Sequence, residues 1–379
     1  MLDEMRLHQS LLGRAGSRAD LNTPALVIDR EALERNIRKM AAFARSSGVA
    51  LRPHAKTHKS VDIARLQIAS GAVGVCCAKL GEAEALADGG IESILITSPV
   101  VSTPAIARLM SLNARLRELI VVVDDPANVA ALARAAVERP MHVLIDIDPG
   151  SRRTGVTSAA AASQLLDRIR GSSHLRYHGV QMYCGTQQHI ARYAERKAAI
   201  ADRVEYLRSV IAELARQDGG PQIITGCGTG THHIDAELGI FNEWQVGSYI
   251  FMDREYAECD LANDATPPYE YALFVDTRVV SANTIGMATV DAGIKALSTD
   301  GGSPVILSGA PAGTTYRFTG DEHGAVVDPA GTHRWSIGDS LRLAVPHCDP
   351  TVNLYDAYHV VSGDTLVDIW PVTARGRSR

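Results

Sequence analysis

The sequence predicts an α/β protein in which a (β/α)8 barrel of the TIM type is followed by a smaller antiparallel β domain. Between Ala25 and about Asp253, short apolar or β-branched runs alternate with helical stretches, and regular alternation of this length indicates a parallel sheet closed into a barrel. From Tyr269 onward, such runs follow one another with turn signals and without helices, as in an antiparallel sheet. A doubly wound open sheet is the alternative, but no G-x-G-x-x-G motif follows the first run.

The individual elements can be assigned along the chain. The runs expected to form barrel strands are 25–29, 49–52, 73–77, 93–97, 119–123, 142–147, 178–183, 222–225 and 243–249. The helical stretches between them include 31–46, 60–70, 81–88, 103–116 and 194–217. The runs of the β part are 271–282, 286–293, 303–309, 314–320, 340–347, 357–363 and 365–372. We therefore expect an N-terminal arm over 1–22, the barrel over 23–258 and the β domain over 259–379.

Composition narrows the class of protein. A chain of 379 residues with 46% hydrophobic residues suits two globular domains. We expect no membrane association, because no apolar run is long enough to cross a bilayer and the first residues lack a secretory h-region. A net charge of −5 does not favour nucleic-acid binding. Six scattered cysteines without a CxxC pair indicate reduced thiols and a cytoplasmic location.

The stretch Arg52-Pro53-His54-Ala55-Lys56-Thr57-His58-Lys59 ends one apolar run and opens a helical stretch. If the strand continues to its end, alternation places Arg52, His54 and Lys56 on one face. A lysine desolvated beside other cations loses part of its proton affinity and becomes a nucleophile. The alternative is a solvated basic turn between strand and helix.

A glycine-rich stretch follows the run 222–225. In Thr225-Gly226-Cys227-Gly228-Thr229-Gly230, alternating glycines let backbone N–H groups converge on an anion, and the position late in a barrel is where this fold commonly holds a phosphate. Gly247-Ser248-Tyr249, after the next run, could complete the cradle. The alternative is a mobile glycine-rich turn.

Three further stretches carry candidate site residues. Arg153 follows the run 142–147 and can donate a fixed fork to a phenolate or carboxylate, or else be a surface arginine. Tyr183 and His189 follow the run 178–183, where His189 could be a general base or a structural histidine. In an extended segment His347 and Asp349 point to one face, a pair that suits a divalent ion completed by water, or an ion pair.

Taken together, these stretches resemble the fold-type III pyridoxal-phosphate enzymes, with their alanine racemase-like barrel, and among them the D-threonine aldolase and D-serine dehydratase-like group. The likeness runs from Thr23 to Pro371. It is carried by RPHAKTHK, GVCCAKLGEAEAL, Arg153 before Gly155, YCGTQQH, TGCGTG, GSYIFMD, DAGIKALSTD, DEHG and PHCDPT. The ordered set is specific for the group and less specific for the substrate.

The resemblance implies a role for each matching residue. Lys56 corresponds to the Schiff-base lysine, with Lys59 in the first turn of the following helix, and His189 to the base of the D-threonine aldolases. The cofactor-binding positions are Lys56, Arg153, Tyr183, Thr225, Gly226, Gly228, Thr229, Gly230, Gly247, Ser248 and Tyr249. His347 and Asp349 correspond to the metal ligands. Cys227 departs from the group, which usually has glycine there; the cradle survives if its φ is negative.

The expected activity is retro-aldol cleavage of a D-3-hydroxy amino acid, D-threonine-like, to glycine and an aldehyde, with pyridoxal 5'-phosphate and a divalent metal. Mn²⁺ is the ion we expect, with Mg²⁺ or Zn²⁺ as alternatives, and the group suggests a homodimer. Zinc dehydratases of the group tend to carry Cys at the Asp349 position, which favours the aldolase. HCDPT also resembles the 3-hydroxyaspartate aldolases. The rival functions are a metal-dependent D-serine or 3-hydroxyaspartate dehydratase, a cofactor carrier without turnover, and a racemase.

Overall fold

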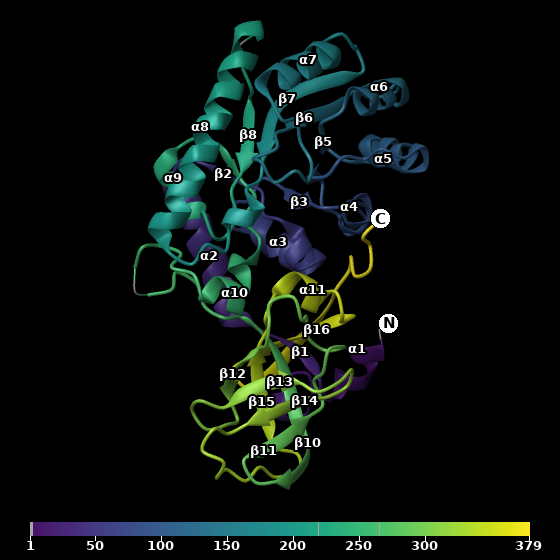
Figure 1. The fold of residues 1–379 in the computed structure, drawn as a ribbon. Coiled ribbons are helices and arrows are strands. Elements are labelled where there is room, and N and C mark those ends of the chain that lie inside the picture. The colour runs from purple at the N-terminus through teal and green to yellow at the C-terminus, as the bar shows by residue number, and fades with distance from the viewer. Residues whose placement is uncertain (1–2, 219, 265) are drawn as a thin grey trace.

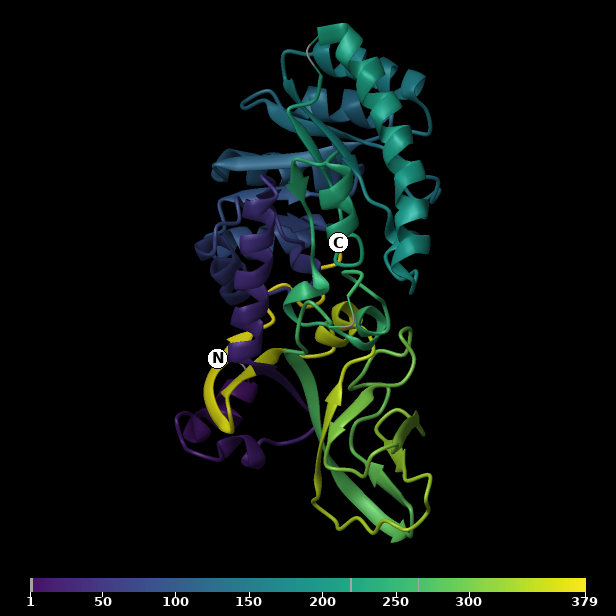
Figure 2. The ribbon, with the colours of Figure 1, turned by 90° about the vertical axis from the view of Figure 1, so that its left-hand side faces the viewer.

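The computed structural model describes residues 3–218, 220–264 and 266–379. It contains an eight-stranded parallel sheet surrounded by helices and a second, nine-stranded sheet, stacked one above the other (Figures 1 and 2). The predicted class, a TIM-type barrel followed by a β domain, is confirmed.

The parallel sheet is the barrel. Its strands are β2 (Ala50–Leu51), β3 (Val75–Cys77), β4 (Ser93–Ile96), β5 (Glu118–Val123), β6 (Met141–Asp146), β7 (Leu175–Met182), β8 (Ile223–Gly226) and β9 (Glu243–Trp244). They pair in the order β2-β9-β8-β7-β6-β5-β4-β3. The two ends meet where the Val73 N–H donates to the Leu51 carbonyl (2.9 Å) and the Cys76 N–H to the Pro53 carbonyl (2.8 Å).

Helices cover the outside of the barrel. They are α2 (Arg30–Ser46), α3 (Val61–Ala69), α4 (Leu80–Asp88), α5 (Thr103–Arg115), α6 (Pro126–Ala135), α7 (Ala159–Arg170), α8 (Tyr193–Asp218) and α9 (His232–Leu238). Local sequence starts several of them: Ser102, Asp125 and Ser158 each accept a hydrogen bond from a backbone N–H of the first turn. A proline at the beginning of α5 and of α6 suits that position, because its missing N–H is not needed there.

Inside the barrel, residues alternate between the lumen and the helices. An apolar layer in the lumen consists of Cys76, Leu95, Ile120, Val122 and Leu144, which come from the neighbouring strands β3 to β6. The neighbours of these residues along each strand belong instead to the large core beneath the helices. The apolar layer separates two polar layers, one at each end of the lumen.

The second sheet contains strands from both ends of the chain. Its strands are β1 (Ala25–Asp29), β10 (Leu273–Thr284), β11 (Met287–Val290), β12 (Val305–Ser308), β13 (Thr315–Phe318), β14 (Gly324–Val327), β15 (Ser340–Ala344), β16 (Ala357–Ser362) and β17 (Thr365–Pro371). The expectation that 25–29 is a barrel strand is wrong, because β1 lies between β10 and β16, antiparallel to the first and parallel to the second. The other eight runs are the eight barrel strands. Strand β14 was not expected.

The N-terminal segment lies against the second sheet. It forms α1 (Asp3–His8) and the 3-10 turns η1 (Gln9–Leu11) and η2 (Ser17–Asp20). Arg18 makes a two-pronged ion pair with Asp276 of β10 (2.7 and 2.8 Å). The His8 imidazole hydrogen-bonds His359 of β16 (2.9 Å). The arm is therefore an integral part of the β domain.

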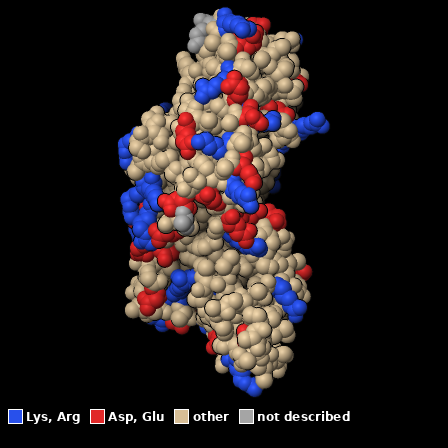
Figure 3. Space-filling model, turned by 60° about the vertical axis from the view of Figure 1, so that its left-hand side comes forward, with Lys and Arg blue, Asp and Glu red and all other residues tan. Residues whose placement is uncertain are grey.

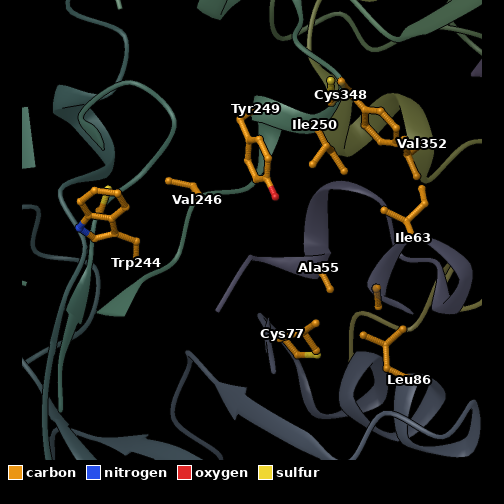
Figure 4. Close-up of a cluster of buried hydrophobic side chains, with 14 of the residues drawn as sticks. Ala55, Ile63, Cys77, Leu86, Trp244, Val246, Tyr249, Ile250, Cys348 and Val352 are labelled. Atoms are coloured by element: carbon orange, nitrogen blue, oxygen red, sulfur yellow. The ribbon is translucent and has the colours of Figure 1, made fainter. Parts of the chain in front are cut away.

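An apolar core joins the two parts. The chain passes from β9 through η5 (Ser248–Ile250) and α10 (Arg254–Ala257) to β10, and α11 (Cys348–Val352) inserts from the β domain. Figure 4 shows Ile250, Cys348 and Val352 together with Ile63 of α3, all buried. Helix α11 is thereby fixed against the carboxyl end of the barrel.

The outer surface carries both signs of charge. Lysine and arginine are interspersed with aspartate and glutamate over the face shown in Figure 3. Among the described helices, none is long and apolar enough to span a bilayer. All six cysteines are free.

Candidate active site

A cavity of about 470 Å³ opens at the carboxyl end of the barrel. Its lining includes half of the fourteen predicted site residues: Lys56, Arg153, Tyr183, Gly228, Thr229, Gly247 and Ser248. They come from the ends of different barrel strands. Closure of the sheet therefore collects stretches that are far apart in the sequence.

Lys56 lies in the 3-10 turn η3 (Ala55–Thr57), directly after the barrel strand. Its ammonium group forms an ion pair with the Asp349 carboxylate from the β domain. Burial is the largest single influence and would lower the pKa of Lys56, but Asp349, Tyr183 and Glu82 together outweigh it and raise that pKa. The expected loss of proton affinity is therefore wrong for this arrangement, in which the lysine faces a carboxylate.

Lys59 occupies a different environment. It precedes the helix cap Ser60 with a positive φ of 51°, so the expectation that it lies in the first helical turn is wrong. Its ammonium group is buried in an ion pair with Glu82. Glu82 also accepts a hydrogen bond from the Ala78 N–H (2.8 Å). Lys59 therefore links the turn after η3 to α4, and it does not line the cavity.

Arg52 shares the lumen face with His54, as expected, but extends toward the opposite end of the barrel. There its guanidinium lies 3.1 Å from carboxylate oxygens of Glu118 and Glu243 and donates to the Ser93 hydroxyl (2.7 Å). His54 hydrogen-bonds the Thr97 hydroxyl (3.1 Å), and burial lowers the pKa of His54 to about 3. His54 is therefore neutral and forms part of the cavity wall.

The glycine-rich turn closes the cavity on the β8–β9 side. The N–H groups of Gly228 and Gly230 donate to the Thr231 hydroxyl (3.2 Å) and to the Gln188 Oε1 (2.9 Å), so these two donors are not free for an anion. The expectation that consecutive glycine N–H groups converge on an anion is thus only partly right. Within the described chain, the N–H groups of Thr229, Gly247 and Ser248 have no protein acceptor, and their residues line the cavity.

The other predicted positions of this turn have structural partners. The Thr229 hydroxyl accepts from the Tyr249 N–H (3.0 Å), and the Thr225 hydroxyl accepts from Gln245 (3.1 Å). Tyr249 is fully buried outside the cavity lining. Cys227 has a φ of +72°, opposite to the negative value expected, and its thiol is buried. The turn keeps its form although a left-handed cysteine is strained.

Arg153 and Tyr183 form one wall of the cavity. The guanidinium lies 5.6 Å from the centre of the tyrosine ring, in a cation–π contact. Burial raises the pKa of Tyr183, so its hydroxyl stays protonated. Arg153 is exposed, and it makes no ion pair with the residues that the structure describes.

A polar network that sequence reasoning missed forms the floor of the cavity. Gln181 donates to the Asp146 carboxylate (2.9 Å) and to the Thr97 carbonyl (3.2 Å), and Gln245 donates to the Gln181 Oε1 (3.1 Å). These residues occupy lumen positions near the carboxyl ends of their strands. A polar side chain at such a position in an otherwise apolar run is the signal that could have identified them.

His347, Asp349 and His189 meet at the rim. His347 precedes α11 and Asp349 lies in its first turn, so the expected extended geometry of this segment is wrong. His347 Nδ1 is 2.7 Å from the Asp300 carboxylate. The exposed His189 ring lies 4.5 Å from that of Tyr256, which lines the cavity. Partial burial lowers the pKa of His189, as do the nearby charges of His347 and Lys56, although Glu255 and Asp349 oppose this shift.

The donor set at the rim is small. In residues 3–218, 220–264 and 266–379, no cluster of three or more His, Cys, Asp or Glu side chains is arranged to hold a metal ion. The Asp349 Oδ1 atom is nevertheless buried and unbonded. The contact with Asp300 leaves His347 Nε2 as the ring nitrogen for a ligand. Two protein donors, with water or substrate in the other positions, fit a divalent cation.

Comparisons with known proteins agree with this architecture. A family model described as "Alanine racemase, N-terminal domain" matches residues 28–255, and one described as "Putative serine dehydratase domain" matches residues 272–361. The chain is 38% identical to a 3-hydroxy-D-aspartate aldolase of Paracoccus denitrificans, covering 95% of this chain and 93% of the relative. It is 30% identical to a D-threo-3-hydroxyaspartate dehydratase of Delftia, covering 92% and 97%.

A solved structure gives the same result. The D-threonine aldolase of Filomicrobium marinum superposes with a TM-score of 0.90 at 39% identity, covering 95% of this chain and 97% of that one. The chain therefore belongs to the alanine racemase N-terminal domain family of pyridoxal-phosphate-type enzymes, and within it to the lyases of the D-threonine aldolase-like group.

Proposed function

We propose that this enzyme cleaves a D-3-hydroxy amino acid into glycine and an aldehyde, using pyridoxal 5'-phosphate and a divalent metal ion. The observation that carries the proposal is the contact between the two domains at Lys56 and Asp349. Through it the candidate cofactor lysine, a candidate metal ligand and the candidate base His189 occupy one end of the barrel.

The cavity fits the cofactor in size and chemistry. Lys56 would hold it covalently, Arg153 would donate to its phenolic oxygen, and Thr229 with Ser248 would bind the phosphate. A cavity of about 470 Å³ lies within the range of small-molecule sites. When bound, pyridoxal phosphate supplies an electron sink for negative charge at the substrate Cα.

The rim fits a divalent ion held by His347 and Asp349, and Mn²⁺ is the ion we expect. Asp349 carries a buried oxygen without a partner, and the Asp300 contact orients the His347 ring. Such an ion would polarise the β-hydroxyl of the substrate. Chelation should remove activity, and adding Mn²⁺ back should restore it; full turnover in metal-free enzyme would exclude this role.

The proton of the substrate β-hydroxyl would be transferred to a side chain of the protein. His189 would accept the β-hydroxyl proton as the Cα–Cβ bond breaks, since the lowered pKa of this imidazole favours its neutral form. Tyr183 and His54, both kept neutral by burial, would add no charge of their own to the site. The substrate would enter through the open mouth beside His189.

β-Elimination is the second candidate, because one relative of this chain is named a D-threo-3-hydroxyaspartate dehydratase. The two reactions differ in their products. Incubation of the enzyme with D-threonine and with D-3-hydroxyaspartate should release glycine with acetaldehyde or glyoxylate. A 2-oxo acid and ammonia as main products would replace the aldolase with the dehydratase. The L-enantiomers serve as controls and should remain uncleaved.

We further propose that the enzyme is a homodimer in solution, as the resemblance to its group implies. Sedimentation equilibrium measures this directly. A mass of about twice the 40.6 kDa of the chain is expected, and a monomer at catalytic concentrations would contradict it.

A further inference from the structure

Gln188 lies between the base and the glycine-rich turn. It directly precedes His189, its side chain is only 1% exposed, and it makes three side-chain hydrogen bonds. Its Oε1 accepts from the Gly230 N–H (2.9 Å), while its Nε2 donates to the Cys184 carbonyl (3.1 Å) and to the Thr231 hydroxyl (3.2 Å). The mechanism proposed above does not use this residue.

The partners fix the orientation of the Gln188 amide. The Gly230 N–H can only donate and the Cys184 carbonyl can only accept, so the oxygen and the nitrogen cannot be exchanged. The Thr231 hydroxyl donates to Asp235 (2.6 Å) and thus receives the bonds from Gln188 and Gly228. Every donor and acceptor of the amide is used.

Packing around Gln188 accounts for the two glycines. A Cβ atom on Gly228 would lie 2.3 Å from the Gln188 Oε1, and one on Gly230 would lie 2.0 Å from the Gln188 carbonyl oxygen. No real side chain tolerates such distances. The turn 228–231 and the loop that carries His189 are therefore in direct contact and can shift only together.

We propose that Gln188 is a positioning residue that joins the phosphate-binding turn to the loop of the general base, so that a firmly held cofactor and a correctly placed His189 depend on one amide. The proposal rests on the proposed function for the role of His189. Because a buried amide that loses its partners leaves several groups unsatisfied, its removal affects both loops at once.

Gln188→Met tests the proposal, because methionine has a similar length and cannot form these bonds. The dissociation constant of pyridoxal phosphate is measured by absorbance as cofactor is titrated back, and kcat is measured separately at saturating cofactor. We expect roughly 10- to 100-fold weaker cofactor binding and, at saturation, a kcat roughly 10-fold lower.

Two variants serve as comparisons. Thr231→Val removes the hydroxyl that accepts from Gln188 and Gly228 but keeps the bond between Gln188 and Gly230, so it should weaken cofactor binding by less than Gln188→Met does. It also covers the case in which Gln188→Met fails to fold. Asn113→Leu replaces a buried amide of α5 that bonds only the Arg139 carbonyl (3.1 Å), so it should lower stability alone.

A Gln188→Met enzyme that loses thermal stability but keeps wild-type cofactor affinity and kcat overturns the proposal, as does a Thr231→Val enzyme with wild-type affinity. Failure of the proposed function gives a different result. If His189→Asn retains the wild-type cleavage rate, the base assignment is wrong, while the effect of Gln188→Met on cofactor affinity still stands.

Discussion

The barrel has a layer of charged side chains at each end, and the two layers differ in how their charge is balanced. At the amino end, Arg52 is 3% exposed and lies between the carboxylates of Glu118 and Glu243. At the carboxyl end, Lys56 faces one carboxylate, Asp349, which comes from the other domain, and opens onto a cavity of about 470 Å³. The apolar layer keeps the two apart.

The difference shows how one stretch of sequence serves two purposes. Arg52 is enclosed by strand ends of the barrel itself, so its charge is satisfied wherever the barrel is folded. Lys56 depends on α11 for its partner and on the cavity for its access. A cation enclosed by its own domain contributes to stability, whereas one that is shared between domains remains available to a ligand.

The largest effect is expected at Lys56. Lys56→Ala should abolish both activity and the covalent hold on the cofactor, whereas Lys59→Ala should keep them and lose only the stability of its buried pair with Glu82. Borohydride reduction of the holoenzyme followed by peptide mapping measures the attachment. A label on Lys59 would refute the assignment and the contrast drawn between the layers.

His189→Asn tests whether the rim of the carboxyl-end layer performs chemistry. Loss of a general base typically costs about 10²- to 10⁴-fold in rate, and cofactor affinity should remain because the imidazole does not line the cavity. Aldehyde release is the readout, and His323→Asn, an exposed histidine of the β domain, is the control. Wild-type cleavage by His189→Asn is the contrary outcome.

Arg52→Met tests the amino-end layer. It leaves two carboxylates without their cation, so the free energy of unfolding should fall by about 3–5 kcal/mol while kcat of the folded enzyme is unchanged. Urea unfolding measures the loss. Adding Glu243→Gln should recover part of it, and a kcat that falls with Arg52→Met would mean that the two layers are not independent.

The smallest effect is expected at Asp146 in the floor of the cavity. Burial raises the pKa of Asp146 to about 6, although the hydrogen bonds from Thr154 and Gln181 oppose this rise. The folded protein then binds more protons than the unfolded chain between about pH 4 and 6, so ionised Asp146 destabilises the fold above pH 6. Asp146→Asn should add roughly 1–2 kcal/mol at pH 8 and little at pH 5 in urea unfolding. An equal gain at both pH values would refute this.

The sequence was a good guide to the elements and a weaker one to their partners. Eight of the nine predicted runs are the barrel strands, because a helix after each run lets the next strand pair in parallel. The run Ala25–Asp29 has the same apolar pattern as the barrel strands. Only its pairing with β10 and β16 shows that it belongs to the second sheet. Pairing over more than 200 residues leaves no local pattern.

For the site, motifs located the residues but not the direction of their side chains. Lumen alternation correctly grouped Arg52 with His54, yet the length of the arginine side chain takes its charge to the opposite end of the barrel. The bend at His347 depends on α11 packing against the barrel, and PHCDPT alone resembles a strand. Nothing in the local sequence marks Gln181, Gln188 and Gln245. Their hydrogen bonds form only when the closed barrel brings distant segments together.

The position of β1 has a consequence for how the protein is made. On the ribosome, Ala25–Asp29 emerges early but must wait for Leu273–Thr284 and then for Ala357–Ser362 before both its edges are paired. During that interval a strand whose first four residues are apolar is available to other nascent chains, so the segment is exposed to aggregation until its partners are made. A barrel fragment for expression should accordingly begin after Asp29, since a start at residue 23 would carry an unpaired strand.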